Sequence, residues 1–427
     1  MHYPWWYVPV LTAPMLIAVI AVIHVVVSHY AVGGGILLAL ENQFAVKTGS
    51  TAYRDYLHQH ARFFVLLTVA FGAITGVGIW WTIALTSPLA TEFLIRTFVF
   101  GWAIEWVFFI VEIVAAFIMY YCWTKMPPRT HVKITWIYAL AAWISLVLIT
   151  GITAFMLDSR SLFSGGTYSS GIVPEFWHAF FNVQFLPQML TRTGGALLLA
   201  ALYVFLHCSW VFRNTQSEMP GIVIKRMTKY IIAGTIFVVI GVVWGGLTLR
   251  LGVWLIIERS VLTNILITVF FGASALVLLG SLFGLFAPKQ INIAFAGCLF
   301  IFGITALGSA EFMREAIRKP WIVDGYVLGN QIYADEIEER QANGFIQPSN
   351  WLNNDGGGTV FMYHCNNCHA LNHGVSAVAP LLAGENKNDI KDKIRKLNQP
   401  IASMPPWCGT EAELEALADF LEKIRPD

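Results

Sequence analysis

Eight apolar runs dominate this chain and restrict it to a helical fold embedded in a membrane. Of its 427 residues 56% are hydrophobic and only 12% are charged, and each run is close to or above the ~20 residues that a helix needs to cross a bilayer. Backbone polar groups in lipid must be paired within the segment, so such runs form helices. We predict an all-α transmembrane bundle with spans near 10–40, 62–86, 93–121, 134–157, 176–212, 230–249, 261–286 and 291–310.

The fifth run is interrupted by polar residues, which leaves open whether only its second half crosses the membrane. The interrupting residues are Gln184, Pro187, Gln188 and Arg192.

The distribution of Lys and Arg predicts how the bundle is oriented. If the N-terminus is outside, the inner loops hold Lys47, Arg54, Arg62, Lys125, Arg129, Lys133, Arg213, Lys225, Arg226, Lys229 and Lys289, and the outer loops hold only Arg160, Arg250 and Arg259. Positive residues concentrate on the cytoplasmic side of membrane proteins. We therefore expect a protein of the bacterial inner membrane whose N-terminus and C-terminal tail are both periplasmic. The net charge of +1 argues against a nucleic-acid partner.

The stretch "YHCNNCHAL" near the C-terminus contains a CxxCH motif, which is typical of covalently attached haem. Cys365 and Cys368 would bond the haem vinyl groups, and His369 would ligate the iron. Met404 in "SMPPW" is the only methionine after the motif and is the expected opposite ligand. With "APLLAG" and a final helix over 411–424, the tail resembles class I c-type cytochromes. The alternative for CxxC alone is a zinc or redox site.

Composition divides the chain into three parts. We predict a membrane domain over residues 1–321, a polar linker over 322–354 that includes "ADEIEERQANG" and "NNDGGG", and a cytochrome c domain over 355–427. So short a tail has little room for its own core, and covalent haem would supply the apolar centre. The remaining cysteines imply no disulfide framework.

Ionisable residues inside apolar spans are costly and therefore indicate function. His24 and His29 lie in the first span, and the glycine-rich "AVGGG" after them would let a flat macrocycle approach the backbone. Glu105 and Glu112 lie two turns apart on one face of the third span, where they could pass protons. The alternatives are a histidine hydrogen-bonded in the core and two acids hydrogen-bonded to neighbouring helices.

Four segments, in order, resemble subunit I of the cytochrome bd oxidases over residues 15–321. They are "FGAITGVGIWW", "LATEFLIRTFVFGWAIEWVFFIVEIVAAF", "HVKITWIYALAAWISLVLI" and "EAIRKPW". The resemblance implies a haem-binding helical bundle that reduces oxygen to water without copper. It also implies one to three non-covalent haems of b or d type and a second membrane subunit as partner.

The resemblance also implies roles for individual residues. His24 is similar to the first-span histidine that ligates a high-spin haem, and Glu105 and Glu112 are similar to paired acids near the oxygen site. Glu315 in "EAIRKPW" resembles the glutamate that ligates the second high-spin haem. Arg318 would contact a propionate or the haem edge, with Trp321 beside it.

Two departures from the family pattern concern the entry of electrons. Only "RLGVWLIIERS" joins spans six and seven, where the family has a long loop that helps oxidise quinol, so the quinol site is in doubt. The family's low-spin haem uses a histidine of span five and a methionine of span seven. Span seven here has no methionine, and His178 is the nearest histidine candidate.

These observations predict a respiratory oxidoreductase that takes electrons from a periplasmic donor through haem c to buried haem. Oxygen would be reduced there, with protons drawn from the inner side past Glu112 and Glu105. One alternative is an electron-transfer subunit that links quinone and haem c in a larger complex. Its two-ligand haems would be held by histidines, for which the chain offers His24, His29, His178 and His207. Another is an anchor with few haems that only tethers a cytochrome c. The spans would contact the lipid bilayer in each case.

Overall fold

Eight long apolar helices form the membrane part of the molecule. The structure, a computed structural model, describes residues 6–159, 176–344, 356–399 and 404–426. Within them eight helices are long and apolar enough to span a membrane, which confirms the predicted number. The spans are α1 (Ala13–Thr48), the continuous α2 (Thr51–Val65), η1 (Leu66–Phe71) and α3 (Gly72–Thr86), then α5 (Val99–Tyr121), α6 (Pro128–Phe155), α9 (Phe185–Val211), α10 (Met219–Thr248), α12 (Val261–Phe286) and α13 (Ile293–Ile317).

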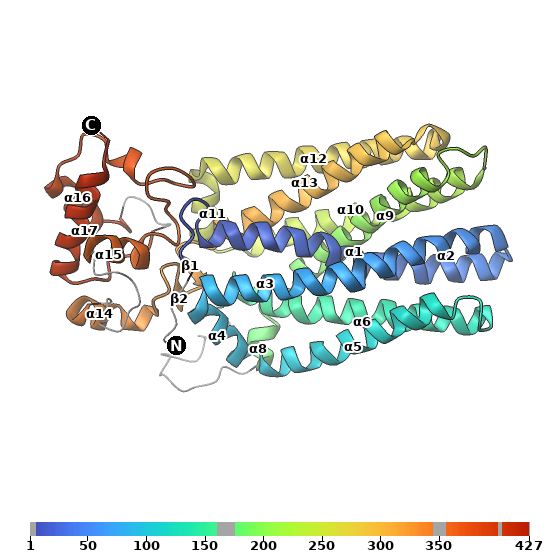
Figure 1. Cartoon of the computed structure of the whole chain (residues 1–427), viewed down its shortest axis with the longest axis horizontal. Helices are drawn as coiled ribbons and strands as arrows, with labels where there is room; N and C mark the ends of the chain where they lie inside the picture. The colour runs from blue at the N-terminus through green and yellow to red at the C-terminus, as the bar shows by residue number, and fades with distance from the viewer. Residues whose placement is uncertain (1–5, 160–175, 345–355, 400–403, 427) are drawn as a thin grey trace.

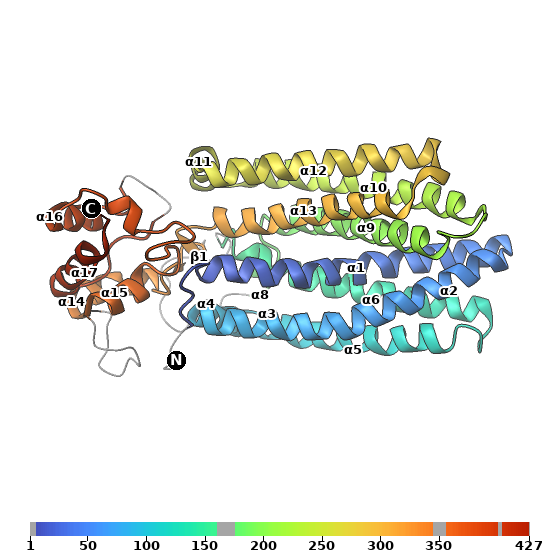
Figure 2. The same cartoon turned by 45° about the horizontal axis from the view of Figure 1, so that its top comes forward.

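The helices lie roughly parallel, with the C-terminal domain at one end of the bundle (Figure 1). The described N-terminal residues begin at this same end, here called the domain end. The short helices α4 (Pro88–Thr97), α8 (Phe176–Phe180) and α11 (Leu251–Arg259) also lie there. The turns that join α1 to α2, α5 to α6, α9 to α10 and α12 to α13 lie at the opposite end (Figure 2). They include η2 (Pro288–Gln290) and hold Lys125, Arg213 and Lys289. Arg160 and linker residues 345–354 lie outside the described part of the chain.

The fifth span is shorter than its apolar run. Its crossing helix α9 begins at Phe185, whereas residues 176–180 form the separate helix α8. Gln188 and Arg192 therefore lie inside the crossing helix. This arrangement places a cationic side chain within the bundle.

Small residues let α1 pack closely against its neighbours. A Cβ on Gly33 would lie 2.0 Å from the carbonyl oxygen of Ala196 in α9, and a Cβ on Gly35 would lie 2.4 Å from the Tyr138 ring of α6. We expected this glycine run to make room for a macrocycle, but neighbouring helices fill the space. The glycines serve close helix contact, as small residues commonly do in membranes.

A folded segment joins the bundle to the C-terminal domain. Strands β1 (Trp321–Val323) and β2 (Val327–Leu328) pair antiparallel, and η3 (Ala334–Glu336) and α14 (Ile337–Asn343) follow. Val323 and Val327 are fully buried in a cluster with residues at the domain end of the bundle. The first part of the predicted linker is thus packed against the membrane domain.

The C-terminal domain is built from short helices around a small apolar core. These helices are α15 (Gly356–His364), η4 (Ala379–Leu382), α16 (Lys387–Arg395) and α17 (Glu411–Ile424). A Cβ on Gly357 would lie only 2.1 Å from the carbonyl oxygen of Ala416, so α15 and α17 cross at close contact. Phe361, Leu414 and Leu417 fill the core between them.

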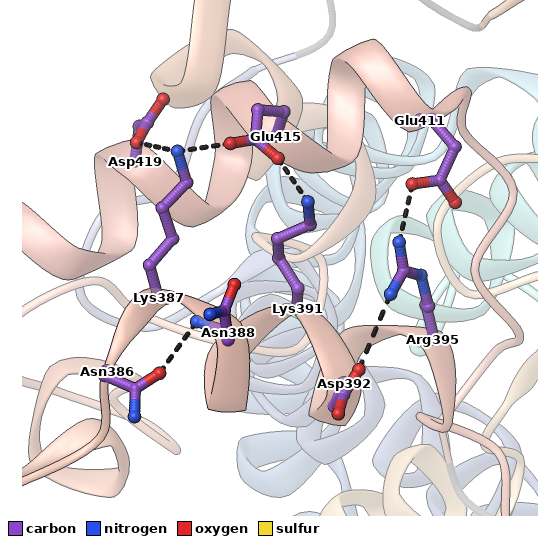
Figure 3. Close-up of polar contacts among 9 residues, drawn as sticks. All are labelled: Asn386, Lys387, Asn388, Lys391, Asp392, Arg395, Glu411, Glu415 and Asp419. Carbon is purple, nitrogen blue, oxygen red and sulfur yellow. Dashed lines mark hydrogen bonds and ion pairs between the residues drawn. The ribbon is translucent and has the colours of Figure 1, made fainter.

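Ion pairs join α16 to α17 on the surface of this domain (Figure 3). Glu415 accepts from both Lys387 and Lys391, and Arg395 lies 2.7 Å from Glu411. Hydrogen bonds from the two ammonium groups lower the pKa of Glu415 to about 2. Because these side chains are exposed, each pair adds little to stability, and salt screens it.

Candidate functional site

His24 is held in the first span by a side chain of the second. Its Nδ1 lies 3.1 Å from Thr75 Oγ1, and its ring packs beside Gly76, where an added Cβ would be 3.4 Å from His24 Cε1. His24 is half-buried in the half of α1 nearer the domain end. The imidazole thus has a defined orientation, as a haem ligand requires.

Glu315 lies in a charged cluster near the domain end of α13. Glu315 is 3% exposed; Arg318 donates to its Oε2, and Arg314 lies 3.3 Å from its Oε1. Arg318 also donates to the carbonyl oxygen of Ile322 at 3.1 Å, which ties the cluster to β1. Trp321, in β1, packs at the junction with the C-terminal domain.

Three more ionisable groups extend this cluster into the bundle. Arg192 of α9 interacts electrostatically with Glu311 of α13, and Glu311 lies 2.9 Å from Arg314. His29, 3% exposed, interacts electrostatically with both Arg192 and Glu311. The sequence marked Arg192 as a costly ionisable residue that interrupts span five, but its interaction with Glu311 of α13 was not foreseen.

Several buried polar atoms in this cluster lack a hydrogen-bond partner. The unpaired donors are Arg314 Nε and Arg318 Nε, and His29 Nδ1 and Glu311 Oε2 also lack a hydrogen bond. Buried polar atoms are nearly always paired, so each exception requires an explanation. A bound group that carries anionic substituents, as haem carries propionates, fits these unpaired donors. The residues between α1 and α13 are therefore compatible with a haem.

The two acids of the third span face α6. Ser145 donates to Glu105 Oε1 at 2.8 Å, and Tyr138 donates to Glu112 Oε1 at 3.0 Å. Ser145 and Tyr138 are themselves two turns apart, so the antiparallel helices place one hydroxyl opposite each carboxyl. Both acids are hydrogen-bonded to a neighbouring helix, as the simpler interpretation proposed. Such bonds are equally compatible with proton transfer.

The CxxCH motif forms one tight turn after α15. The backbone N–H groups of Cys368 and His369 both donate to the carbonyl oxygen of Cys365, at 3.0 and 2.9 Å. His369 Nδ1 lies 2.7 Å from the carbonyl oxygen of Ser376. A carbonyl only accepts, so Nδ1 carries the proton and Nε2 keeps its lone pair for iron.

Burial lowers the pKa of His369, which favours its neutral imidazole. Burial also raises the pKa of the Cys365 thiol to about 12. Met404 lies in a half-buried bend before α17. The histidine, the two thiols and the later methionine fit covalent haem c, which is the group that the sequence predicts for this motif.

The loop after the motif docks onto the membrane domain. Val375 N–H donates to the carbonyl oxygen of Val10 at 2.9 Å, and Asn366 Nδ2 donates to that of Val8 at 3.4 Å. Trp6 N–H in turn donates to Leu85 O at the end of α3. The N-terminal segment therefore lies between the motif and the bundle.

A second contact brings Cys368 to the segment that follows the Glu315 cluster. A Cβ on Gly329 would be 3.8 Å from Cys368 Sγ, and Gly329 N–H donates to the carbonyl oxygen of Pro320. Buried Cys408 packs with Leu328 in the same junction. The motif and the end of α13 are thus joined through one short hairpin.

His178 is not brought together with the other candidates. It lies in α8 at the domain end of the bundle, and its side chain is exposed. The crossing helix of span five begins after it. The structure places it at the surface, away from the packed interior of the bundle.

Two polar networks near the opposite end were not predicted as networks, although His207 was one of the histidines considered as a haem ligand in the alternative function. Glu41, 1% exposed, accepts from Arg226, Tyr53 and Tyr230. In the other network the rings of His60 and His207 pack edge to face, with their centroids 4.8 Å apart. An acid directly after the first predicted span, 10–40, was the available signal for Glu41.

Comparison with known proteins agrees with this architecture. Residues 13–251 match the family model of cytochrome bd terminal oxidase subunit I, and residues 353–421 match that of cbb3-type cytochrome c oxidase subunit III. The chain is similar in fold to the bd oxidase from Geobacillus thermodenitrificans. The TM-score is 0.63 and the identity 14%, over 74% of this chain and 89% of that one. No curated protein matches.

The resemblance given by the four quoted segments is therefore confirmed, as are the all-α membrane fold and the c-type cytochrome domain. The first family model spans more than half of the 427 residues. The protein belongs to the cytochrome bd terminal oxidase subunit I family and carries a c-type cytochrome domain in its C-terminal part.

Proposed function

We propose that this protein is the haem-bearing subunit of a membrane oxidase that receives electrons through its own cytochrome c domain. A donor at the domain end would deliver the electrons, and oxygen would be reduced in the bundle. The observation that carries the proposal is the docking of the CxxCH turn, through Gly329 and Pro320, onto the segment that follows Glu315. Covalent haem c supplies one-electron transfer, and a buried haem with an open iron position supplies oxygen chemistry.

The proposed ligands are His369 and Met404 in the cytochrome domain, and His24 and Glu315 in the bundle. Arg318 and the arginines near it would pair with haem propionates. Their guanidinium groups are buried beside the acids, and Arg314 and Arg318 each keep an unpaired Nε. An arginine is suited to this role because its fork matches a carboxylate.

Glu112 and Glu105 would hold and pass protons toward the reacting centre. They lie on one face of α5, each within hydrogen-bond distance of a hydroxyl of α6. A hydroxyl can both donate and accept, so Tyr138 and Ser145 can remain bonded when either acid gains or loses its proton. The side from which protons enter would be the end rich in basic loops, which we propose is cytoplasmic.

The proposal also concerns location and partners. The domain end would face the bacterial periplasm, and the spans would contact lipid and a second membrane subunit. Large apolar side chains of α5, α10 and α12 are exposed and suit either surface. Between α10 and α12 the chain has only the short helix α11 (Leu251–Arg259) in place of the family's long loop that helps oxidise quinol. This supports electron entry through haem c, and quinone belongs to the alternative function.

Optical spectra test the proposed oxidase. The dithionite-reduced protein would be measured before and after carbon monoxide, and a pyridine haemochrome assay would give the haem types. We expect a carbon monoxide shift in a non-c haem that is lost in His24→Ala or Glu315→Ala. His178→Ala is the matched control because that histidine is exposed. No shift, with only six-coordinate b and c signals, would instead indicate an electron relay between quinone and haem c.

The same spectra test the choice between the two histidines of α1. If the shift survives His24→Ala but is lost in His29→Ala, the ligand is the buried His29. If both variants keep it, neither imidazole of α1 ligates the reactive haem.

A further inference from the structure

Thr75 contacts His24 in an arrangement that determines where the imidazole proton lies. Thr75 Oγ1 is 2.8 Å from the carbonyl oxygen of Phe71 and 3.1 Å from His24 Nδ1. A second carbonyl oxygen, that of Gly72, is 3.2 Å from Oγ1. Thr75 is 9% exposed, so water does not compete freely for these bonds.

A hydroxyl has one proton to donate and lone pairs to accept with. Carbonyl oxygens only accept. The carbonyl of Phe71 is the nearer partner of Oγ1, at 2.8 Å against 3.1 Å for Nδ1, so the proton of Thr75 is assigned to that carbonyl and Nδ1–H of His24 donates to Oγ1. A neutral imidazole that is protonated on Nδ1 presents the lone pair of Nε2, which can bind a metal.

We propose that Thr75 is a positioning residue that holds His24 in its Nδ1–H tautomer, with Nε2 directed to haem iron. This inference rests on the proposed function, in which His24 is a ligand. His369 uses the same device in the cytochrome domain, where the carbonyl oxygen of Ser376 accepts from Nδ1. Outer-shell acceptors of this kind orient metal-binding histidines and raise their basicity.

The local backbone explains why the acceptor lies at this point. A π-helical turn, η1, ends at Phe71, the residue whose carbonyl takes the Thr75 proton. Such turns change the register of the residues that follow and occur often at functional sites. Gly76 comes next, and a Cβ added there would touch the His24 ring at ordinary contact distance, 3.4 Å from Cε1. Both Thr75 and Gly76 therefore face the imidazole.

Hydrogen bonding of a threonine to the carbonyl four residues earlier is common in apolar helices and is not itself a sign of function. Thr82 in the same helix does this with Gly78 at 2.9 Å and is 6% exposed. In the part of the chain that the structure describes, Thr82 makes no hydrogen bond to a histidine. It therefore provides a matched control for the loss of a buried, back-bonded hydroxyl from α3.

The test uses the full-length haem-loaded protein and the variants Thr75→Val, Thr75→Ser and Thr82→Val. Valine keeps the shape of threonine and removes the acceptor, whereas serine retains it. The first readout is the iron–histidine stretching band of the ferrous protein in resonance Raman spectra. The second is the rate at which non-covalent haem passes to apomyoglobin.

We expect Thr75→Val to shift the iron–histidine band and to retain haem about 10- to 100-fold less well. Thr75→Ser should restore both, and Thr82→Val should match the wild type. Equal bands and equal haem loss in Thr75→Val and Thr82→Val would overturn the inference.

His24→Ala separates this failure from failure of the proposed function. If His24→Ala abolishes the iron–histidine band but Thr75→Val leaves it unchanged, only the role of Thr75 is wrong. If His24→Ala leaves the band in place, His24 is not the ligand and both proposals fail.

Discussion

Gly374 offers a direct test of whether electrons pass through the docked form of the cytochrome domain. The residue has a φ of +117°, and a Cβ added to it would lie 2.4 Å from the carbonyl oxygen of Val10. Ordinary contact begins at 3.4 Å, so Gly374→Ala must widen the gap by about 1 Å (3.4 − 2.4). The adjacent hydrogen bond from Val375 N–H to Val10 O would then break.

The magnitude follows from these two effects. A lost hydrogen bond costs about 1 kcal/mol, and overpacking costs about 1–3 kcal/mol. Together they weaken docking by about 2–4 kcal/mol, which is a factor of roughly 30 to 900 in the docking equilibrium. If only the docked form delivers electrons to the bundle, the oxidation of haem c by oxygen should slow as the docked fraction falls, by at most this factor.

The assay is stopped-flow mixing of the reduced protein with oxygen, followed at the haem c α-band. Gly384→Ala is the matched control: it has a φ of +76° in the same domain and no atom within 4 Å of its added Cβ. Both variants carry the strain of an alanine at positive φ, and only one disturbs docking. Equal oxidation rates in the two variants would refute the proposed electron route.

Three further predictions concern other parts of the molecule. Glu112→Gln should lower oxygen turnover by about 10²- to 10⁴-fold, the usual contribution of a proton-transfer group, with haem spectra unchanged; normal turnover would exclude Glu112 from the proton path. Glu41→Gln leaves Arg226 without its counter-charge and should lower the free energy of unfolding by about 2–4 kcal/mol. This is below the top of the range for broken buried pairs because Arg226 is 25% exposed. Thermal unfolding in detergent measures the change, and an unchanged midpoint would contradict it. The pKa of Glu415 is lowered to about 2, so its ion pairs contribute fully above its unfolded pKa of about 4.3 and are lost as pH falls toward 2. The small difference in thermal midpoint between wild type and Glu415→Gln should therefore shrink over that pH range and in 1 M salt. A difference that grows on acidification would contradict this sign.

The spans and the haem c motif could be predicted because their signals are local. An apolar run of membrane length admits one backbone solution, and CxxCH needs only a single turn. Residues 51–61 were expected to be a loop because they are polar, yet α2 begins at Thr51. Their buried residues Tyr53, Tyr56, Leu57 and His60 recur at helical spacing, which was a readable sign of a helix packed against α1.

The contacts that complete the candidate site could not be predicted from local patterns. Thr75 is one of several threonines in apolar runs, and nothing in its neighbourhood identifies the helix that it faces. The pairing of Arg192 with Glu311 joins spans five and eight, and it depends on how the helices pack. The β1–β2 hairpin forms from a segment read as a linker, because Val323 and Val327 find a buried surface at the end of the bundle.

Docking of the CxxCH loop on the N-terminal segment changes the kinetics that a donor would encounter. A cytochrome that is both tethered through α14 and held by hydrogen bonds to Val8 and Val10 has a high effective concentration at its acceptor. The transfer of electrons from haem c to the haem of the bundle would then be intramolecular. Its rate should not depend on protein concentration or ionic strength. Only the encounter with the external donor would retain the salt dependence of a diffusional reaction. If the proposed function is correct, the protein would respond to the supply of its donor without a mobile carrier between haem c and the haem of the bundle.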